Sequence, residues 1–226
     1  DLRAALDSVL INGHLWPPFA VSRVPAPWTR ESSRAWILSV RSFIVLPGIY
    51  DSGPAHWQTL WEQDPSFVRF QPADWDVPTR ADWVAALEVA VVAAPEPPVL
   101  VAHSLACLLV PIWAAQSSSP VAGAMIVAPV DPAAGAFPEA AADFATFPRE
   151  PLPFPSLVVG SLDDHYADVE YAQGFAADLG AEFLVAGALG HINADSGLDD
   201  WPQGRDLLAG FVAGLGGGSR AGTGVV

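Results

Sequence analysis

From about residue 41 onward, short runs of apolar residues alternate with longer segments in which apolar residues recur every three or four positions. Short apolar runs bounded by Gly, Pro or polar residues are typical of buried strands, and the longer period is typical of helices that bury one face. We expect six strands, over residues 42–46, 67–70, 99–102, 121–128, 156–160 and 182–185. Strands that alternate with helices predict a parallel sheet covered on both faces, and right-handed crossovers give the strand order 2-1-3-4-5-6.

The segments between the strands carry helix signals. Thr79 can cap the helix that follows it, Asp82 falls in the first turn of that helix, and Trp83, Leu87 and Val91 form an apolar stripe at a spacing of four. Further helices are expected around residues 56–61, over 105–115, around 171–179 and over 201–212. Residues 131–155 are rich in Ala and Pro, so we expect irregular structure there with one short helix near 138–144.

The two ends of the chain do not follow the alternation. Residues 1–38 contain prolines that interrupt regular structure, so we expect an irregular extension outside the main fold. Residues 39–213 are expected to form one domain, and 214–226, rich in Gly and Ser, a flexible tail. A chain of 226 residues with 51% hydrophobic composition can build one sizeable core.

Charge and cysteine content narrow the class of partner. The formal net charge of -15 disfavours nucleic acid and anionic membrane surfaces, because both require positive charge at the contact. No apolar run has the length of a membrane span. The lone Cys107 excludes an intramolecular disulfide and fits a reducing compartment, so we expect a cytoplasmic protein. The partner that we expect is a small-molecule substrate. Whether a protein partner also binds stays open.

The transition from strand to helix at Ser104 is the main candidate for chemistry. The apolar run 99–102 stops at His103, and a helical segment starts directly after Ser104. In the nucleophile elbow G-x-S-x-G, small residues two positions before and after the serine let strand and helix pack closely. Here Ala102 and Ala106 keep the small size without the backbone freedom of glycine. An ordinary buried serine at a strand end is the alternative.

Three strands are followed by residues that could form a catalytic triad. Ser104 follows the third strand, Asp163 and Asp164 follow the fifth, and His191 follows the sixth. The carboxyl ends of parallel strands meet at one edge of the sheet, and the order Ser, Asp, His is the one that α/β-hydrolases use. A serine hydroxyl needs an imidazole to take its proton, and a carboxylate holds the imidazole in the correct tautomer. Each residue alone has an ordinary explanation as a turn residue.

An acyl-transfer intermediate also needs two backbone N–H donors for its oxyanion. The first candidate is the N–H of Leu105, directly after the nucleophile. The second should come from the loop after the first core strand, where the N–H of Ile49 is our choice and that of Tyr50 the second. Gly48 in that loop could equally be a simple turn glycine.

The other histidines and the cysteine have less specific roles. His103 is expected to point into the fold, and a packing or capping role is favoured for His56 over contact with substrate. His165 could compete as a base, but neighbouring residues in a tight turn rarely point at one another. Cys107 is expected to pack as a small apolar residue. A metal site formed by His103, His165 and His191 is possible in principle, but no spacing typical of metal ligands supports it, so we predict no metal.

The motifs together resemble a known family. The segments that carry the resemblance are Leu46-Pro47-Gly48 with Ser52-Gly53-Pro54-Ala55-His56-Trp57-Gln58, Ala102-His103-Ser104-Leu105, Ser161-Leu162-Asp163-Asp164 and Gly190-His191-Ile192-Asn193-Ala194-Asp195-Ser196-Gly197. Over about residues 41–213 the chain is similar to the small serine hydrolases of the retinoblastoma-binding-protein-9-like (YdeN-like) family. The resemblance implies a compact α/β-hydrolase fold with no large lid domain, no cofactor and a Ser-Asp-His triad.

Carried over by position, the resemblance makes Ser104 the nucleophile, His191 the base and Asp164 the acid. The spacing from Gly160 seen in other hydrolases would favour Asp163 instead. We therefore predict a serine hydrolase that cleaves an ester, thioester or amide bond through an acyl-enzyme on Ser104. The alternatives are a binding protein that keeps the fold with little or no turnover, and a metallohydrolase.

Overall fold

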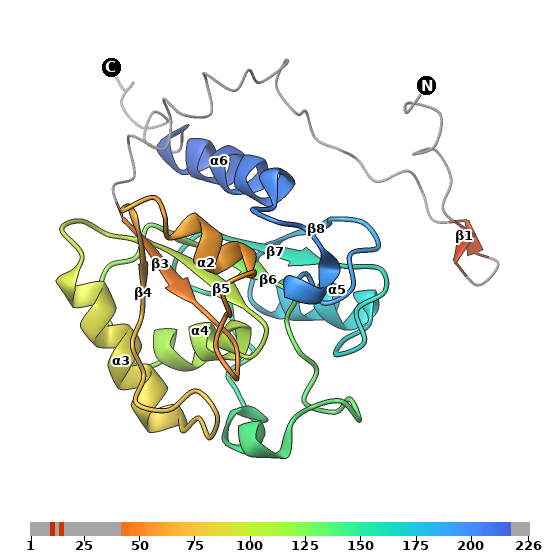
Figure 1. Ribbon diagram of the computed structural model, residues 1–226, viewed down its shortest axis with the longest axis horizontal. Helices are drawn as coiled ribbons and strands as arrows, with labels where there is room; N and C mark the ends of the chain where they lie inside the picture. The colour runs from red at the N-terminus through yellow and green to blue at the C-terminus, as the bar shows by residue number, and fades with distance from the viewer. Residues whose placement is uncertain (1–9, 12–13, 16–41, 218–226) are drawn as a thin grey trace, which may run out of the picture.

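The computed structural model describes residues 10–11, 14–15 and 42–217, and a six-stranded sheet lies at its centre (Figure 1). The sheet order is β4-β3-β5-β6-β7-β8, and every neighbouring pair is parallel. The strands are β3 (Phe43–Leu46), β4 (Phe67–Arg69), β5 (Val99–His103), β6 (Gly123–Val127), β7 (Ser156–Gly160) and β8 (Glu182–Val185). The predicted parallel sheet and the predicted strand order are both confirmed.

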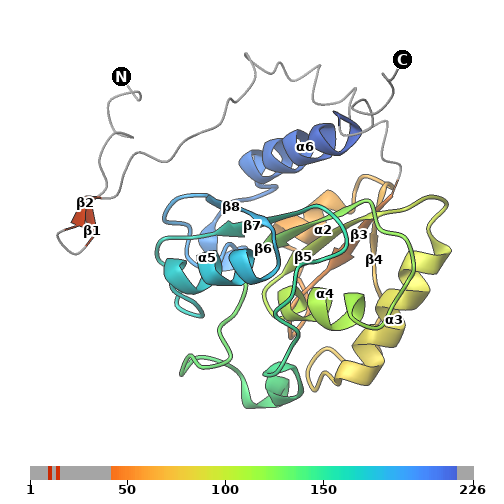
Figure 2. The same ribbon diagram turned by 180° about the vertical axis from the view of Figure 1, so that it is seen from behind.

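Successive strand residues point to opposite faces of the sheet, so each face has its own core. Ile44, Leu100 and Ile126 pack on one face with α3 (Arg80–Ala93), α4 (Ala106–Ala114) and α5 (Val169–Asp178). Phe43, Val101 and Met125 pack on the other face with α2 (Trp57–Trp61) and α6 (Pro202–Gly217). Figures 1 and 2 show α2 and α6 on the side of the sheet opposite to α3 and α4.

Most helix signals correspond to observed elements. Thr79 caps α3 by accepting from the N–H of Asp82, and the buried side chains of α3 are Trp83, Leu87 and Val91, as the stripe predicts. The short helix expected near 138–144 is the 3-10 helix η1 (Glu139–Phe144). A second 3-10 helix, η2 (Ala194–Ser196), was not expected.

The ends of the chain differ in part from expectation. The last helix continues to Gly217 instead of ending near 212, so the first residues of the expected tail are helical. Glycine lowers helix propensity but does not forbid a helix. Residues 218–226 lie outside the described residues. Within the expected extension, β1 (Leu10–Ile11) pairs antiparallel with β2 (His14–Leu15), and the rest of residues 1–41 lies outside the described part.

Three tryptophans fix α2 and α6 against the sheet. The Trp57 ring lies 4.6 Å from that of Trp61 and 5.1 Å from that of Trp201, both edge to face, which is a favourable geometry for aromatic pairs. The Trp201 ring also covers Gly204, where a Cβ would come within 2.1 Å of it. Trp57 Nε1 donates to the carbonyl of Ile192 at 2.8 Å. Helix α2 is thereby tied to the segment that carries His191.

No helix in the part of the chain that the structure describes is long and apolar enough to cross a membrane.

Candidate active site

Ser104 lies at a sharp turn between β5 and α4. Its φ is +57°, a left-handed conformation that costs a residue other than glycine about 1–3 kcal/mol. Backbone hydrogen bonds hold it there, because Ser104 N donates to the carbonyl of Val127 and Cys107 N donates to that of Ser104. Ala102 and Ala106 are fully buried on either side. The elbow therefore forms with alanine at both flanking positions, and it presents the hydroxyl at its tip.

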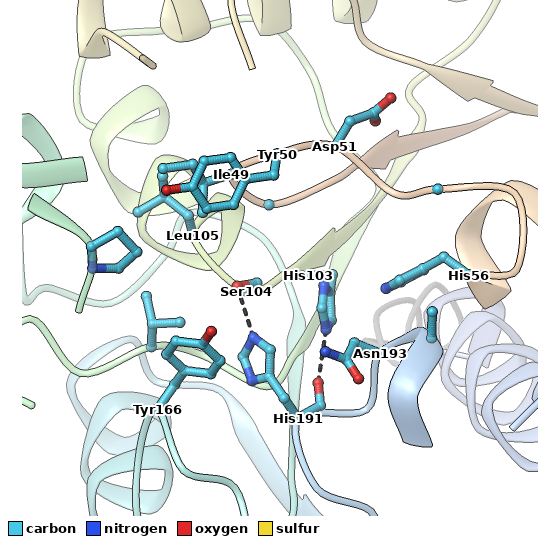
Figure 3. A pocket seen from close by; sticks show the side chains of 15 residues that line it. Ile49, Tyr50, Asp51, His56, His103, Ser104, Leu105, Tyr166, His191 and Asn193 are labelled. Carbon is cyan, nitrogen blue, oxygen red and sulfur yellow. Dashed lines mark hydrogen bonds between the residues drawn. The ribbon is translucent and has the colours of Figure 1, made fainter. Parts of the chain in front are cut away.

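His191 contacts both Ser104 and Asp164, and Figure 3 shows its contact with the serine. The hydroxyl of Ser104 lies 2.8 Å from His191 Nε2, and His191 Nδ1 lies 2.8 and 3.0 Å from the two carboxylate oxygens of Asp164. The side chains of His191 and Asp164 are 5% and 3% exposed. A carboxylate on Nδ1 selects the tautomer with its proton on that nitrogen, which leaves Nε2 free to accept the serine proton.

The neighbouring Asp163 makes different contacts. Its carboxylate accepts from Gly190 N at 2.7 Å and from the hydroxyl of Ser161 at 3.0 Å. These hydrogen bonds favour the charged form and hold the pKa of Asp163 below its ordinary value. Of the two adjacent carboxylates, Asp164 thus contacts the imidazole and Asp163 fixes the backbone just before it.

The loop around His191 turns sharply on both sides of the imidazole. Gly190 has a φ of +56° and Ile192 a φ of +49°. After the turn, Asn193 caps η2, and Ser196 completes a capping box with it while also donating to the carbonyl of Leu189 at 2.6 Å. The capping box and the Ser196 hydrogen bond, together with the hydrogen bond from Trp57, hold the imidazole of His191 at the sheet edge.

The loop after β3 passes directly over Ser104. A Cβ on Gly48 would lie 2.7 Å from Ser104 Cβ, 3.0 Å from its hydroxyl oxygen and 3.3 Å from Leu105 N. Gly48 is therefore required by a close approach and not only by a turn. Within the described part of the chain, the N–H groups of Ile49 and Leu105 donate no hydrogen bond, whereas Tyr50 N donates to the carbonyl of Trp75. Of the two predicted second donors, Ile49 is the free one.

Two polar side chains that the sequence did not single out support this loop. The fully buried Gln58 donates to the carbonyls of Leu46 and Val101 and accepts from Ser52, so it ties α2 to the carboxyl ends of β3 and β5. Arg69 contacts Asp51 at 2.6 Å. It also donates to Glu62, to Thr59 and to the carbonyl of Ser52. Gln58 lies in the segment 52–58 that carries the family resemblance, whereas no sequence pattern pointed to Arg69.

The remaining candidates behave as expected in their local contacts. His103 is buried and its Nε2–H donates to the carbonyl of His191 at 2.9 Å. His56 caps α2. His165 is exposed and packs against Tyr166. Burial raises the pKa of the Cys107 thiol, which points to the carbonyl of Val127. Among the described residues there is no group of three or more His, Cys, Asp or Glu that could hold a metal ion.

A cavity of about 220 Å³ opens onto the serine. Figure 3 shows Tyr166 on one side of Ser104, and His56 and Asn193 on the other. Asp51 is the one acidic residue among the described residues that line the cavity, and it is paired with Arg69. None of the described residues that line the cavity is Lys or Arg. The cavity is thus small, and its described lining offers no permanently charged cation to bind an anion.

The fold and this cluster define the chain as an α/β-hydrolase. The sequence model of the family described as serine hydrolase matches residues 43–210. The chain therefore belongs to this serine hydrolase family, and it is a hydrolase. A comparison with curated proteins finds no match.

Solved structures agree with this assignment. A YdeN-like hydrolase from Pectobacterium atrosepticum is 28% identical with a TM-score of 0.72, covering 82% of this chain and 97% of its own. The ydeN gene product from Bacillus subtilis is 18% identical with a TM-score of 0.64, covering 77% and 100%. An esterase from a Rhodococcus species is 16% identical with a TM-score of 0.56, covering 78% and 92%. The last two matches show the fold, and the first supports the predicted YdeN-like family.

Proposed function

We propose that this protein is an esterase-type serine hydrolase that forms an acyl-enzyme on Ser104, with His191 as general base and Asp164 as the residue that orients it. One observation carries the proposal: an unbroken chain of hydrogen bonds runs from the Ser104 hydroxyl through both ring nitrogens of His191 to the Asp164 carboxylate. A buried chain of this kind activates a hydroxyl that is otherwise a weak nucleophile.

In the first step, Ser104 Oγ attacks the carbonyl carbon while its proton passes to His191 Nε2. The carbonyl oxygen becomes an oxyanion, and the N–H groups of Leu105 and Ile49 stabilise it. The bond to the leaving group then breaks, and His191 gives its proton to the departing oxygen, sulfur or nitrogen. Water attacks the acyl-serine, His191 takes a proton from that water, and the acid leaves as Ser104 regains its proton.

The size and charge of the cavity indicate the substrate class. About 220 Å³ is below the roughly 300–1,000 Å³ of pockets that hold drug-sized ligands, so a short acyl group fits best. The absence of Lys and Arg among the described lining residues and the net charge of -15 disfavour substrates that carry a carboxylate. We propose small, uncharged esters, thioesters or amides as the substrates.

A fluorophosphonate probe tests the proposal, since it forms a covalent bond only with an activated serine. We expect labelling of the wild type and none of the Ser104→Ala variant. Absence of labelling in both would favour a protein that binds its ligand without turnover. Hydrolysis that disappears on addition of a chelator would instead indicate a metallohydrolase.

A further inference from the structure

One of the two ring nitrogens of His56, Nδ1, has a structural role as the cap of α2. It accepts from the backbone N–H of Gln58 at 3.1 Å and so caps α2. Burial, with a smaller contribution from Arg69, lowers the pKa of His56 to about 4, so the ring is neutral at pH 7. Because Nδ1 uses its lone pair as an acceptor, the single ring proton lies on Nε2.

The other ring nitrogen has no partner. The side chain is 4% exposed, and within the described part of the chain Nε2 is a buried donor without a hydrogen bond. His56 lines the cavity, and Figure 3 shows its ring directed from α2 towards the space beside Ser104 and His103. Buried polar groups are almost always hydrogen-bonded, so an unpaired donor in the wall of an active-site cavity calls for a partner that the cavity admits.

We propose that His56 is a specificity-determining residue, whose Nε2–H donates to an uncharged oxygen of the substrate outside the scissile group, such as a second carbonyl, an ether or a hydroxyl. The inference rests on the proposed serine hydrolase function and adds a substrate feature to it. An uncharged acceptor suits the site because the cavity has no Lys or Arg among its described lining residues. A site built to donate to an oxygen discriminates against the analogue that lacks it, because the donor is then left unpaired.

Two variants separate the donor from the helix cap. Asn is among the best N-cap residues, so His56→Asn keeps an acceptor near the Nδ1 position and removes the Nε2–H together with the outer part of the ring. His56→Ala removes both the cap and the donor. Esters are compared in pairs that differ only by an oxygen in place of a methylene, for example p-nitrophenyl methoxyacetate and p-nitrophenyl butyrate. A second series places the oxygen in the alcohol part of the ester.

The measured quantity is the ratio of kcat/KM for each oxygen ester over its carbon analogue. Differences in intrinsic reactivity cancel when this ratio is compared between wild type and variant. We expect the ratio to fall by about 3- to 10-fold in both His56→Asn and His56→Ala for at least one series, as the loss of one buried hydrogen bond predicts. An equal fall in both variants assigns the effect to the donor.

Three outcomes overturn the inference. The ratios can be the same in wild type and His56→Asn for both series, which removes His56 from recognition while fluorophosphonate labelling still supports the serine hydrolase. The ratio can fall in His56→Ala alone, which assigns the effect to the cap of α2. The wild type can fail to be labelled or to hydrolyse any ester, in which case the proposed function fails and the role of His56 fails with it.

Discussion

The elbow at Ser104 and the loop at His191 are held in place by different means. The elbow depends on neighbours in sequence and on the sheet: Ala102 and Ala106 are small enough to be buried, and Val127 on the adjacent strand accepts from Ser104 N. The His191 loop depends on side chains from distant segments. Trp57 and Asp163 hold its backbone, at sequence separations of 135 and 27 residues. The proposed nucleophile is thus positioned by its own strand and the adjacent one, and the proposed base by contacts from distant segments.

The adjacent carboxylates give the sharpest test of this difference. Asp164→Asn keeps the shape of the side chain but no longer selects the required imidazole tautomer, so we expect kcat to fall by about 10⁴-fold. Asp163→Asn removes a support of the loop backbone, and we expect a loss of about 10-fold, in the range of supporting side chains in other catalytic sites. Ester hydrolysis by both purified variants measures this. Equal losses in the two variants would contradict the assignment of Asp164.

Gly48→Ala tests the close approach of the loop after β3 to the elbow at Ser104. The added methyl group would lie 3.0 Å from the hydroxyl oxygen and 3.3 Å from Leu105 N, in the space where the oxyanion should bind. We expect kcat/KM to fall by about 10²- to 10³-fold, as for the loss of an oxyanion donor. Gly53→Ala is the matched control in the same loop, because a Cβ there meets nothing within 4 Å. Similar losses in both variants would argue against the proposed oxyanion site.

Gln58→Leu tests the side chain that ties α2 to β3 and to β5, the strand that leads into the elbow. Replacing it leaves the hydroxyl of Ser52 and the carbonyls of Leu46 and Val101 without this buried partner. We expect the free energy of unfolding to fall by about 3 kcal/mol, since a buried polar group left unpaired costs about 1–3 kcal/mol. Gln116→Leu, at an exposed residue that bonds only to its own helix, is the control and should change stability by less than about 0.5 kcal/mol. Urea unfolding measures both, and a stable Gln58→Leu protein would contradict this role.

The buried histidines predict how stability depends on pH. The pKa of His56 is about 4 in the folded protein against 6.5 for the free side chain, and burial lowers the pKa of His103 as well. Between these values the unfolded chain binds more protons than the folded one, so stability is complete above about pH 6.5 and is lost as the pH falls towards 4. At 1.36 kcal/mol for each pH unit, His56 should account for a loss of about 2 kcal/mol between pH 7 and 5.

Urea unfolding at pH 7 and pH 5 measures this loss. His56→Asn should reduce the difference between the two pH values, and substitution of the exposed His165 by Asn should leave it unchanged. If His56→Asn keeps the full pH dependence, the burial of a neutral imidazole at this position is not its cause.

The sequence predicted the features that depend on short segments. The six strands, the cap at Thr79 and the turn at Ser104 follow from apolar runs and from single residues with strong local preferences. The chain order of Ser, Asp and His predicted candidates for the site, and in the structure His191 lies within hydrogen-bond distance of both Ser104 and Asp164.

Features that depend on contacts between distant segments were not predictable from periodicity. Gln58 falls in a motif of the family resemblance, but its contacts, like those of Arg69, could not be predicted, because an amide or a guanidinium gains its role only from the carbonyls and carboxylates placed around it. Periodicity likewise could not predict that Asp164 contacts the imidazole of His191 while Asp163 binds the backbone of Gly190, because both contacts depend on where the His191 loop lies in the fold. The extra turns of α6 run through glycines that local propensity disfavours.

Direct detection of an acyl-enzyme tests the central claim. The protein is mixed with a short p-nitrophenyl ester, quenched in acid within one turnover, digested and analysed by mass spectrometry. The account predicts one acyl group on the peptide that contains Ser104, and no such adduct in Ser104→Ala. Ester turnover without an adduct on Ser104, or with the acyl group on another residue, would contradict it.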